Sequence, residues 1–289
     1  MIKKESKFRR MTAEDVPGAD VLRQFEGWNQ TIEDWRRLLS LQPDGCFVAT
    51  SKSEVVGSVT TTTYGSALGW IGMMLVHPDY RNRGIGTRLM RLALDHLDAC
   101  AIGCVKLDAT PAGQSVYEKL GFIVEETLTR FMRPANYANQ ATLDEFAGVR
   151  RLNNADWPSV ELIDAAAFGA SRDTLLRGLE RQSHATLVWT EKGSVTGYGM
   201  LRSGSHADYL GPLVCSDNRS GVALASALLA SGGKRPVIWD VPDRCAPAKE
   251  AAQRFGFISR RILTRMRRGP EMISSNLDAQ FGIADPAVG

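Results

Sequence analysis

The sequence predicts a layered α+β protein in which one fold occurs twice along the chain. Three observations predict it. The chain has 289 residues, of which 44% are hydrophobic, enough for two medium-sized cores. An apolar run passes through a glycine loop into an amphipathic helix between Trp70 and Leu97. A short motif near residue 120 returns 135 positions later, which a duplicated fold explains.

The chain opens with a predicted strand followed by two helices. The segment 8–11 is typical of a strand. Thr12, with Asp15 three residues later, resembles a capping box and predicts a helix start. Helical patterns continue to about Leu41 and are interrupted near residues 27–31, so we expect a helix pair.

The next predicted unit is a strand, a basic loop and a helix. Residues 71–76 are apolar and are bounded by Gly69 and Pro78, as expected of a short buried strand. From Thr87 onward, apolar residues recur at helical spacing. The loop 81–86, Arg-Asn-Arg-Gly-Ile-Gly, therefore lies where a strand passes into a helix.

This loop suits an anion. A helix N-terminus has unpaired amide hydrogens and partial positive charge, and glycines let the backbone approach phosphate oxygens. The loop has neither the third glycine of the dinucleotide fingerprint nor the Gly-Lys-Ser/Thr of a P-loop. A tight turn that needs a positive φ at Gly84 or Gly86 is the structural alternative.

The strand, loop and helix together resemble motif A of the GNAT superfamily of acyl-CoA-dependent N-acetyltransferases. The resemblance implies two tandem folds, each a mixed, mostly antiparallel sheet with flanking helices and splayed central strands. It implies acetyl-CoA as acyl donor. The implied contacts are Arg81, Arg83, Gly84, Ile85, Gly86 and Thr87 at the pyrophosphate, and Met74, Leu75 and Val76 along the pantetheine arm.

A second string, from Val105 to Phe122, supports the same assignment. It predicts a strand, a turn and a short helix that ends at Gly121. Tyr117 lies four residues before Gly121, and a GNAT tyrosine at this place often protonates the departing thiolate of coenzyme A. The resemblance therefore implies that Tyr117 is the general acid. A tyrosine ring packed on the helix with a wet hydroxyl is the alternative.

The general base and the acceptor site are expected among a few residues near the predicted sheet. The acceptor amine must lose a proton before it attacks, and Asp108 is the nearest acidic candidate, with Glu26 behind it. Asp108 capping the following turn is an equal alternative. In GNAT folds the first helices lie over the acceptor mouth, which implies Glu26, Trp28 and Asn29 there. Core packing of Trp28 with Trp35 is the alternative.

The second copy is recognised by its ending. The motifs at 120–123 and 128–130, Leu-Gly-Phe-Ile and Leu-Thr-Arg, return at 255–258 and 263–265 as Phe-Gly-Phe-Ile and Leu-Thr-Arg. Polar, small and proline residues gather at 133–142, so we place the domains at residues 1–135 and 136–289. A last strand is expected after Pro270.

The copies differ where chemistry is expected. Ala252 stands where the first copy has Tyr117, and residues 217–223 keep only one glycine of the loop. We therefore expect a catalytic first domain and a divergent, non-catalytic second domain that shapes the acceptor pocket.

Composition bounds the remaining possibilities. A net charge of +3 does not indicate a nucleic-acid partner, and no apolar run is long enough for a membrane span. Five cysteines without a CxxC pair and four scattered histidines indicate no metal site. We expect a cytoplasmic protein, a monomer or homodimer.

The leading hypothesis is transfer of an acetyl group from acetyl-CoA to a primary amine by direct attack. The amine is a small molecule, an amino sugar, a peptide N-terminus or a lysine side chain. A non-enzymatic acyl-CoA-binding or sensing protein is the alternative. A nucleotide-binding α/β protein of another type is a third hypothesis, weakened by the absence of an early acidic ribose partner.

Overall fold

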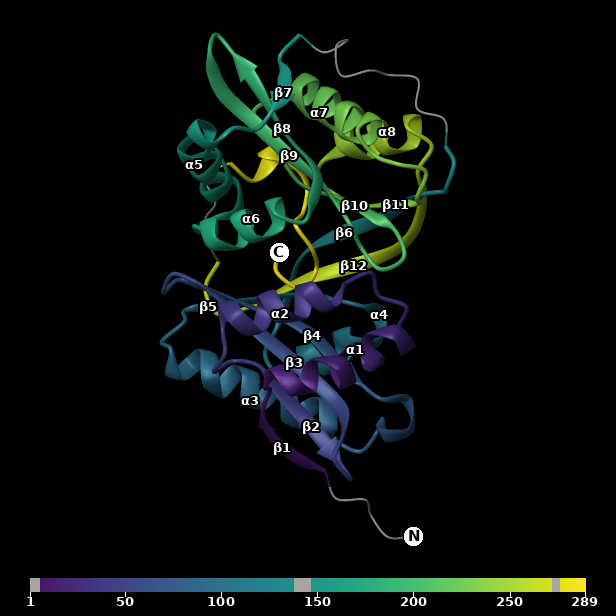
Figure 1. Cartoon of the computed structure of the whole chain (residues 1–289). Helices are drawn as coiled ribbons and strands as arrows, with labels where there is room; N and C mark the ends of the chain where they lie inside the picture. Colours follow the sequence, from purple (N-terminus) through teal and green to yellow (C-terminus); the bar gives the residue numbers. More distant parts are fainter. Residues whose placement is uncertain (1–5, 138–146, 272–275) are drawn as a thin grey trace.

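The structure, a computed structural model, describes residues 6–137, 147–271 and 276–289. Its two halves lie one above the other in Figure 1, the N-terminal half in purple and blue below and the C-terminal half mostly in green above. Each half has helices on both faces of its part of one sheet. The predicted layered α+β fold and its repetition are confirmed.

The N-terminal half contains β1 (Lys7–Arg10), η1 (Ala13–Asp15), α1 (Val16–Phe25), α2 (Ile32–Leu41), β2 (Phe47–Ser51), β3 (Glu54–Tyr64), β4 (Leu68–Val76), η2 (Pro78–Tyr80), α3 (Ile85–Ala99), β5 (Cys104–Ala109), α4 (Pro111–Glu118) and β6 (Ile123–Arg133). The C-terminal half contains β7 (Val149–Arg151), η4 (Asn154–Asp156), α5 (Trp157–Phe168), α6 (Asp173–Glu180), β8 (Ser183–Glu191), β9 (Ser194–Arg202), β10 (Asp208–Cys215), α7 (Asn218–Ala230), β11 (Val237–Pro242), α8 (Ala246–Arg254), β12 (Ile258–Arg268), η5 (Leu277–Ala279) and β13 (Gln280–Gly282). Apart from η2, the two orders match element by element as far as β12.

Local sequence explains how the first helices begin and end. Thr12 and Asp15 form the predicted capping box ahead of α1. Thr31 and Asp34 form a second capping box at the start of α2. Gly27 lies between the two helices with φ of +62°, a conformation that favours glycine. The predicted helix pair is confirmed.

The apolar core joins the two halves. One cluster lies beneath α1 and α2, includes the fully buried Trp35, and continues beneath α5 and α6 to Phe168 and Val288. Separate clusters lie beneath α3 and beneath α7 and α8. Each large apolar side chain that is fully buried stabilises the fold by roughly 1.5–3 kcal/mol. The shared cluster therefore holds the halves in one arrangement.

The halves also exchange their last strands. The strands of the described chain form one sheet in which β12 lies between β5 and β6, and β6 lies between β12 and β11. Figure 1 shows β6 and β12 running together between the two halves. All pairings are antiparallel except β4–β5 and β10–β11. Each half therefore completes the sheet of the other.

Two buried ion pairs connect the exchanged strands to their new neighbours. Arg130 on β6 donates to both carboxylate oxygens of Asp240 on β11, at 2.7 and 2.5 Å. Arg265 on β12 donates to both oxygens of Asp108 on β5, at 2.8 and 2.9 Å. Both arginines end the repeated Leu-Thr-Arg motif, so the arginine of each copy binds the aspartate of the other. Losing one partner of such a pair costs roughly 3–5 kcal/mol because a buried charge remains.

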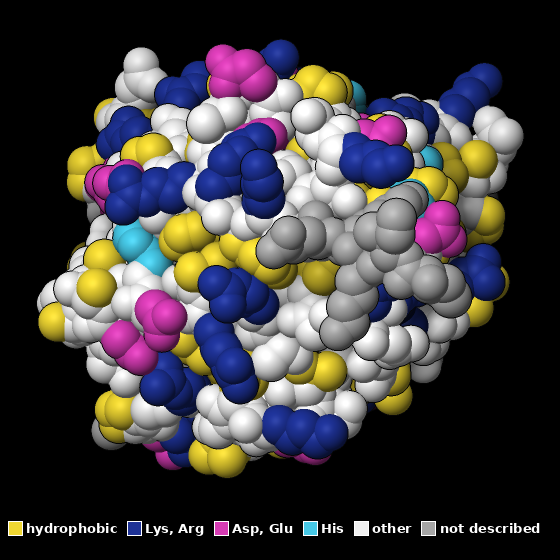
Figure 2. All heavy atoms as spheres, turned by 90° about the horizontal axis from the view of Figure 1, so that it is seen from below, with side chains coloured by type: hydrophobic (Ala, Val, Ile, Leu, Met, Phe, Trp, Pro, Cys, Tyr) yellow, Lys and Arg dark blue, Asp and Glu magenta, His cyan; other side chains and the backbone are white. Residues whose placement is uncertain are grey.

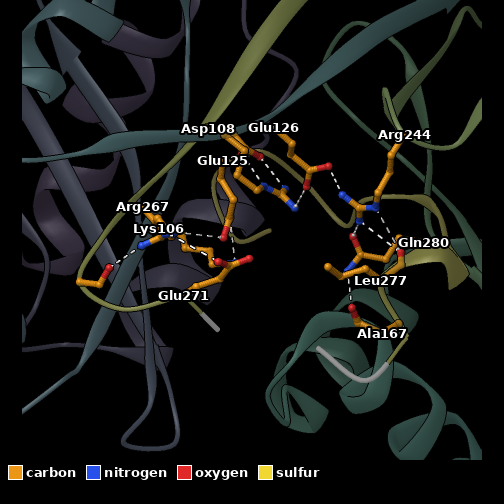
Figure 3. A network of polar contacts seen from close by, with 12 residues as sticks. Lys106, Asp108, Glu125, Glu126, Ala167, Arg244, Arg267, Glu271, Leu277 and Gln280 are labelled. Carbon is orange, nitrogen blue, oxygen red and sulfur yellow. Dashed lines mark hydrogen bonds and ion pairs between the residues drawn. The ribbon is translucent and has the colours of Figure 1, made fainter. Parts of the chain in front are cut away.

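A polar network continues from Arg265 into the C-terminal segment (Figure 3). Glu126 accepts a hydrogen bond from Arg265 at 3.5 Å and forms an ion pair with Arg244. Arg244 donates to the side chain of Gln280 at 3.0 Å, and Gln280 donates to the carbonyl of Ala167 on α5 at 2.9 Å. The network thereby ties β6 and β12 to β13 and to the helices of the second half.

Candidate active site

The loop after β4 leaves the start of α3 open. Gly84 is the N-cap residue of α3 and has φ of +79°, in the left-handed region where a side chain is strained. No side chain caps this helix. Its first amide groups are therefore available to an anion, as the motif predicted. The tight turn of the structural alternative, with a positive φ at Gly84, is present as well, so this turn and the uncapped helix start occur together.

The central strands splay beside this loop. β4 pairs with β5 only from Leu68 to Trp70, whereas β12 pairs with the other edge of β5 from Val105 to Ala109. Met73 has φ of +48° and lies opposite a register shift in β3, where the Ser58 hydroxyl donates to its carbonyl at 2.9 Å. Residues 74–76 thus leave the β4–β5 ladder, and a cleft opens between the two strands.

The outer part of this cleft has a volume of about 350 Å³. Met74, Leu75 and Val76 line one wall, and Arg81, Gly84, Ile85, Gly86 and Thr87 line its end. A Cβ atom at Gly86 would lie 3.4 Å from the Met74 side chain, so any longer side chain there would occupy the cleft. The structure thus brings together all the residues expected at coenzyme A except Arg83.

Arginines surround the mouth of the cleft. Arg81 donates to the carbonyl of Val76 at 3.1 Å and forms an ion pair with Glu26, which follows α1. Arg83 donates to the carbonyl of Asp79 and lies over the ring of Tyr80, 5.1 Å from its centroid. Glu26 therefore lies beside the predicted phosphate loop, with its charge opposed by an arginine.

The wider surface of this half carries both signs of charge. Figure 2, which shows the molecule from below, has Lys and Arg side chains dispersed among Asp and Glu side chains and apolar side chains. No helix of the described residues combines the length and apolar character that a bilayer crossing needs. The positive charge relevant to an anionic ligand is therefore local to the loop.

Tyr117 on α4 lies where the outer cleft meets a narrower inner cavity, and it lines both. Its ring packs against Phe122 with centroids 6.2 Å apart, and against Gly113, where a Cβ atom would lie 2.9 Å from the ring. No hydrogen bond joins its hydroxyl to any residue that the structure describes. Burial raises the pKa of Tyr117 to about 12, so the hydroxyl keeps its proton at neutral pH.

The inner cavity has a volume of about 40 Å³ and contains residues that the sequence did not single out. Arg130, Arg261 and Leu263 come from the exchanged strands, and Gln30 and Ala287 come from the loop after α1 and from the C-terminal segment. They are far apart in sequence. The repeated Leu-Thr-Arg motif marked Arg130 and Leu263, but it did not indicate which strands would meet.

Asp108 lines the same cavity, but both of its oxygens accept hydrogen bonds from Arg265. Its side chain has no solvent exposure. Burial raises the pKa of this carboxyl even beside the guanidinium. These contacts form an ion pair. They show neither the expected general base nor the alternative turn cap.

Trp28 and Asn29 were both expected at the acceptor site, and they lie differently. Trp28 lines both parts of the cleft. The Asn29 side chain is buried against the second half, where it accepts from the amides of His206 and Ala207 at 3.0 and 2.9 Å and donates to the Ala207 carbonyl at 3.0 Å. These bonds point to a role in docking the two halves, and contact of Asn29 with an acceptor stays a prediction.

The C-terminal segment forms one wall of the inner cavity. The Trp70 indole donates to the carbonyl of Pro286 at 3.0 Å, and the Tyr64 hydroxyl donates to that of Val288 at 2.7 Å. A Cβ atom at Gly72 would lie 2.4 Å from the Ala287 carbonyl oxygen, so glycine is needed for this close approach. The second half thus reaches into the first at the splayed strand.

The equivalent place in the second half is filled by the protein itself. β10 and β11 pair only at their beginnings, but β13 lies antiparallel to Leu213 and Val214 of β10. Asp217 caps α7 and accepts from the Ser220 amide at 2.8 Å. A Cβ atom at Gly221 would lie within 2.4 Å of the Phe281 ring. The last strand expected after Pro270 is confirmed, and it occupies the second splay.

Comparison with known proteins identifies the class. The model of the "Acetyltransferase (GNAT) family" matches residues 13–122, and that of the "Acetyltransferase (GNAT) domain" matches residues 160–282. Acetyltransferase SG1711 of Sodalis glossinidius is 35% identical over 106 residues, which cover 35% of this chain and 72% of the relative. The chain therefore belongs to the GNAT family, and it is an acyltransferase with two such domains.

The similarity to other proteins extends over both halves of the chain. The uncharacterized N-acetyltransferase YitH of Bacillus subtilis is 23% identical over 249 residues, 86% of each chain. A proposed acetyltransferase from Pyrococcus horikoshii has a crystal structure similar to this one, with a TM-score of 0.85, 25% identity, and coverage of 100% of this chain and 98% of that one. The tandem GNAT protein from the clavulanic acid biosynthesis pathway has the same fold, with a TM-score of 0.65, 17% identity, and coverage of 92% and 100%.

Proposed function

We propose that the N-terminal half transfers an acetyl group from acetyl-CoA to a primary amine by direct attack. The position of Tyr117 carries this proposal, because its protonated hydroxyl lies between the cleft beside the uncapped helix and the inner cavity. A donor held in the outer cleft and an acceptor held in the inner cavity would meet at this side chain.

Three features of the chain fit coenzyme A. The free amides at the start of α3 suit its pyrophosphate, and the lack of a side chain at Gly86 leaves room for it. Residues 74–76 lie outside the β4–β5 ladder and suit an extended arm that pairs with a strand. Acetyl-CoA, when bound, supplies the acyl group as a thioester.

The proposed transfer balances with one acid. The nitrogen of the neutral amine forms a bond to the acyl carbon, and the carbon–sulfur bond breaks. The departing sulfur takes the proton of the Tyr117 hydroxyl, and the proton lost by the amine restores it directly or through water. In this proposal Tyr117 stabilises the negative charge that develops on the sulfur atom.

We assign Asp108 to the ion pair with Arg265, and we keep Glu26 only as a distant candidate for the base. Both carboxylates face arginines, and the Asp108 carboxylate is bound at both oxygens. An amine that binds in its neutral form, or loses its proton to water, needs neither residue. The acceptor is small, or presents a narrow amine-bearing end, because the inner cavity has a volume of about 40 Å³.

The second half is proposed to shape the acceptor pocket without binding acetyl-CoA. Its support is twofold: β13 and the Asp217 carboxylate occupy the places that an arm and an anion would need, and Ala287 lines the pocket of the first half. The protein is proposed to work in the cytoplasm as an amine acetyltransferase, where its five free thiols suit a reducing medium.

Calorimetric titration of acetyl-CoA, followed by an assay of thiol release with pooled amines, tests the proposal. Binding at one site per chain with release on some amine is the expected result. Binding without release on any amine would favour the non-enzymatic acyl-CoA sensor. Absence of binding would overturn the donor site. Tyr117→Phe is the matched variant, since it should bind acetyl-CoA normally and release thiol slowly.

A further inference from the structure

The inner cavity contains an arginine that the protein does not neutralise. Arg261 lies at a register shift in β12, directly opposite Arg130 on β6. It lines the cavity, and neither an ion pair nor a hydrogen bond joins its side chain to any described residue. Its Nε atom is buried without a partner. The side chain as a whole is only partly buried, so its other guanidinium nitrogens remain open to a ligand. Burying Nε without an acceptor is costly, and a binding role explains why this cost is tolerated.

The neighbouring charges do not neutralise it. Arg130 is bound at both oxygens of Asp240, and the Tyr209 hydroxyl donates to the same carboxylate at 2.8 Å. Burial and the nearby Arg130 lower the pKa of Arg261. Asp285 lies behind the cavity wall and accepts from the Gln30 side chain at 2.8 Å. Each of these carboxylates therefore already has another donor.

The acidic residues expected to attract a cationic amine are also engaged. Asp108 is bound by Arg265, and Glu26 by Arg81. Among the described residues that line the inner cavity, Asp108 is the one carboxylate and Arg261 is the cation without a counter-charge. The cavity therefore favours an anionic group over a second cationic one.

We propose that the acceptor is an amine that carries a carboxylate, and that Arg261 binds this carboxylate while the amine lies near Tyr117. This inference rests on the proposed function. A guanidinium group donates two parallel hydrogen bonds to a carboxylate, which gives both orientation and discrimination. Trp28 and Leu263 also line this cavity, so an apolar spacer between the amine and the carboxylate suits it.

The test compares two acceptors that differ in the anionic group. 4-Aminobutyrate and 4-aminobutanamide have the same spacer, and thiol release from acetyl-CoA reports the turnover of each. The wild type should favour the carboxylate in kcat/KM by about 10- to 100-fold, the range expected of a charged hydrogen-bonded contact. Arg261→Gln should remove this preference by raising KM for the carboxylate much more than KM for the amide, with the affinity for acetyl-CoA unchanged.

Arg260→Gln is the matched control, because Arg260 is the neighbouring residue on β12 and its side chain is exposed. It should retain the preference. Equal use of acid and amide by the wild type, or a preference that survives in Arg261→Gln, would overturn the inference.

A second measurement separates this inference from the proposed function. If neither amine releases thiol, calorimetry with N-acetyl-4-aminobutyrate and its amide still measures recognition at Arg261, with or without coenzyme A. Tighter binding of the carboxylate that Arg261→Gln abolishes would support the site even if the transfer reaction failed. Equal binding, or none, would overturn it.

Discussion

In both halves a helix begins after a strand that splays from its neighbour. The halves differ in what occupies the start of that helix and the space between the splayed strands. In the first half, Gly84 leaves α3 uncapped beside a cleft of about 350 Å³. In the second, the Asp217 carboxylate caps α7 and β13 lies in the splay. The protein's own carboxylate and strand thus stand where the first half has space for an anion and an extended arm. The difference teaches that the splay belongs to the fold, whereas ligand binding depends on keeping it empty.

The largest expected effect concerns Tyr117, for which the second half has Ala252. Tyr117→Phe should lower kcat by about 10²- to 10⁴-fold, the usual contribution of a positioned acid. The affinity for acetyl-CoA should stay the same, because the ring and its packing remain. Steady-state kinetics and calorimetry measure the two effects separately.

Tyr137→Phe is the control for this substitution, since Tyr137 is an exposed tyrosine beyond the end of strand β6. Because the pKa of Tyr117 is raised to about 12, the hydroxyl is protonated throughout the neutral and moderately alkaline range, and wild-type kcat should not fall up to about pH 10. Full turnover by Tyr117→Phe would make Tyr117 a packing residue like its counterpart.

The ion pairs Arg130–Asp240 and Arg265–Asp108 should contribute similar amounts to the free energy of unfolding. Asp108→Asn and Asp240→Asn each leave a buried arginine without a counter-charge, so each should lower the free energy of unfolding by roughly 3–5 kcal/mol. Urea denaturation measures this. Asp98→Asn is the control, because its pair with Arg268 is exposed and should contribute at most about 1 kcal/mol. A stable but inactive Asp108→Asn variant would instead identify the general base.

A single side chain can block the proposed phosphate site at residues 81–86. Gly86→Glu places a carboxylate in the outer cleft and should weaken acetyl-CoA binding by about 100-fold, close to 3 kcal/mol. Gly233→Glu is the matched control in the second half, where a Cβ atom meets nothing within 4 Å. Calorimetry gives both affinities. Normal binding of acetyl-CoA by Gly86→Glu would show that the loop is not part of the donor site.

The smallest effect is expected at the capped helix. Hydrogen bonds from the Ser220 amide and the Ser216 hydroxyl to the carboxylate hold the pKa of Asp217 below its ordinary value. The cap therefore stabilises the fold above the ordinary carboxyl pKa of about 3.9, and this stabilisation is lost as the pH falls through the lowered value. Asp217→Ala should cost about 1 kcal/mol at pH 7 and much less at strongly acidic pH, by urea denaturation.

Acetyl-CoA stoichiometry completes the test of Asp217. One molecule should bind per chain in both the wild type and Asp217→Ala, because β13 still fills the splay. A second bound molecule would show that the two halves differ less than their contacts indicate.

Much of the candidate site could be predicted from the sequence because its residues lie close together along the chain. The strand, loop and helix from Leu68 to Ala99 are contiguous, so the pattern predicted a loop at the start of a helix, with a positive φ at Gly84 or Gly86 as the alternative. The resemblance to the GNAT family added the wall formed by residues 74–76 and the expectation for Tyr117, which lies four residues before Gly121. Both kinds of prediction used motifs that are contiguous in the sequence.

The remaining features depend on contacts between distant segments. Because both copies end in Leu-Thr-Arg, the sequence does not say which aspartate Arg130 or Arg265 will bind. Asn29 offered no signal that it docks on the second half. Arg261 acquires its place only because β12 crosses into the first half. The exchange of two strands that share the Leu-Thr-Arg motif cannot be resolved from local patterns.

The strand exchange also delays completion of the first half's sheet during synthesis. β5 is complete at Ala109, whereas its neighbour β12 begins at Ile258, 149 positions later. At roughly 5–20 residues per second, a ribosome needs roughly 7–30 s to supply that strand. Until then the backbone edge of β5 is unmatched on the emerging chain, and such an edge attracts strands from other molecules. The N-terminal half is thus the first to be translated, yet its sheet is completed only after nearly the whole messenger RNA has been read.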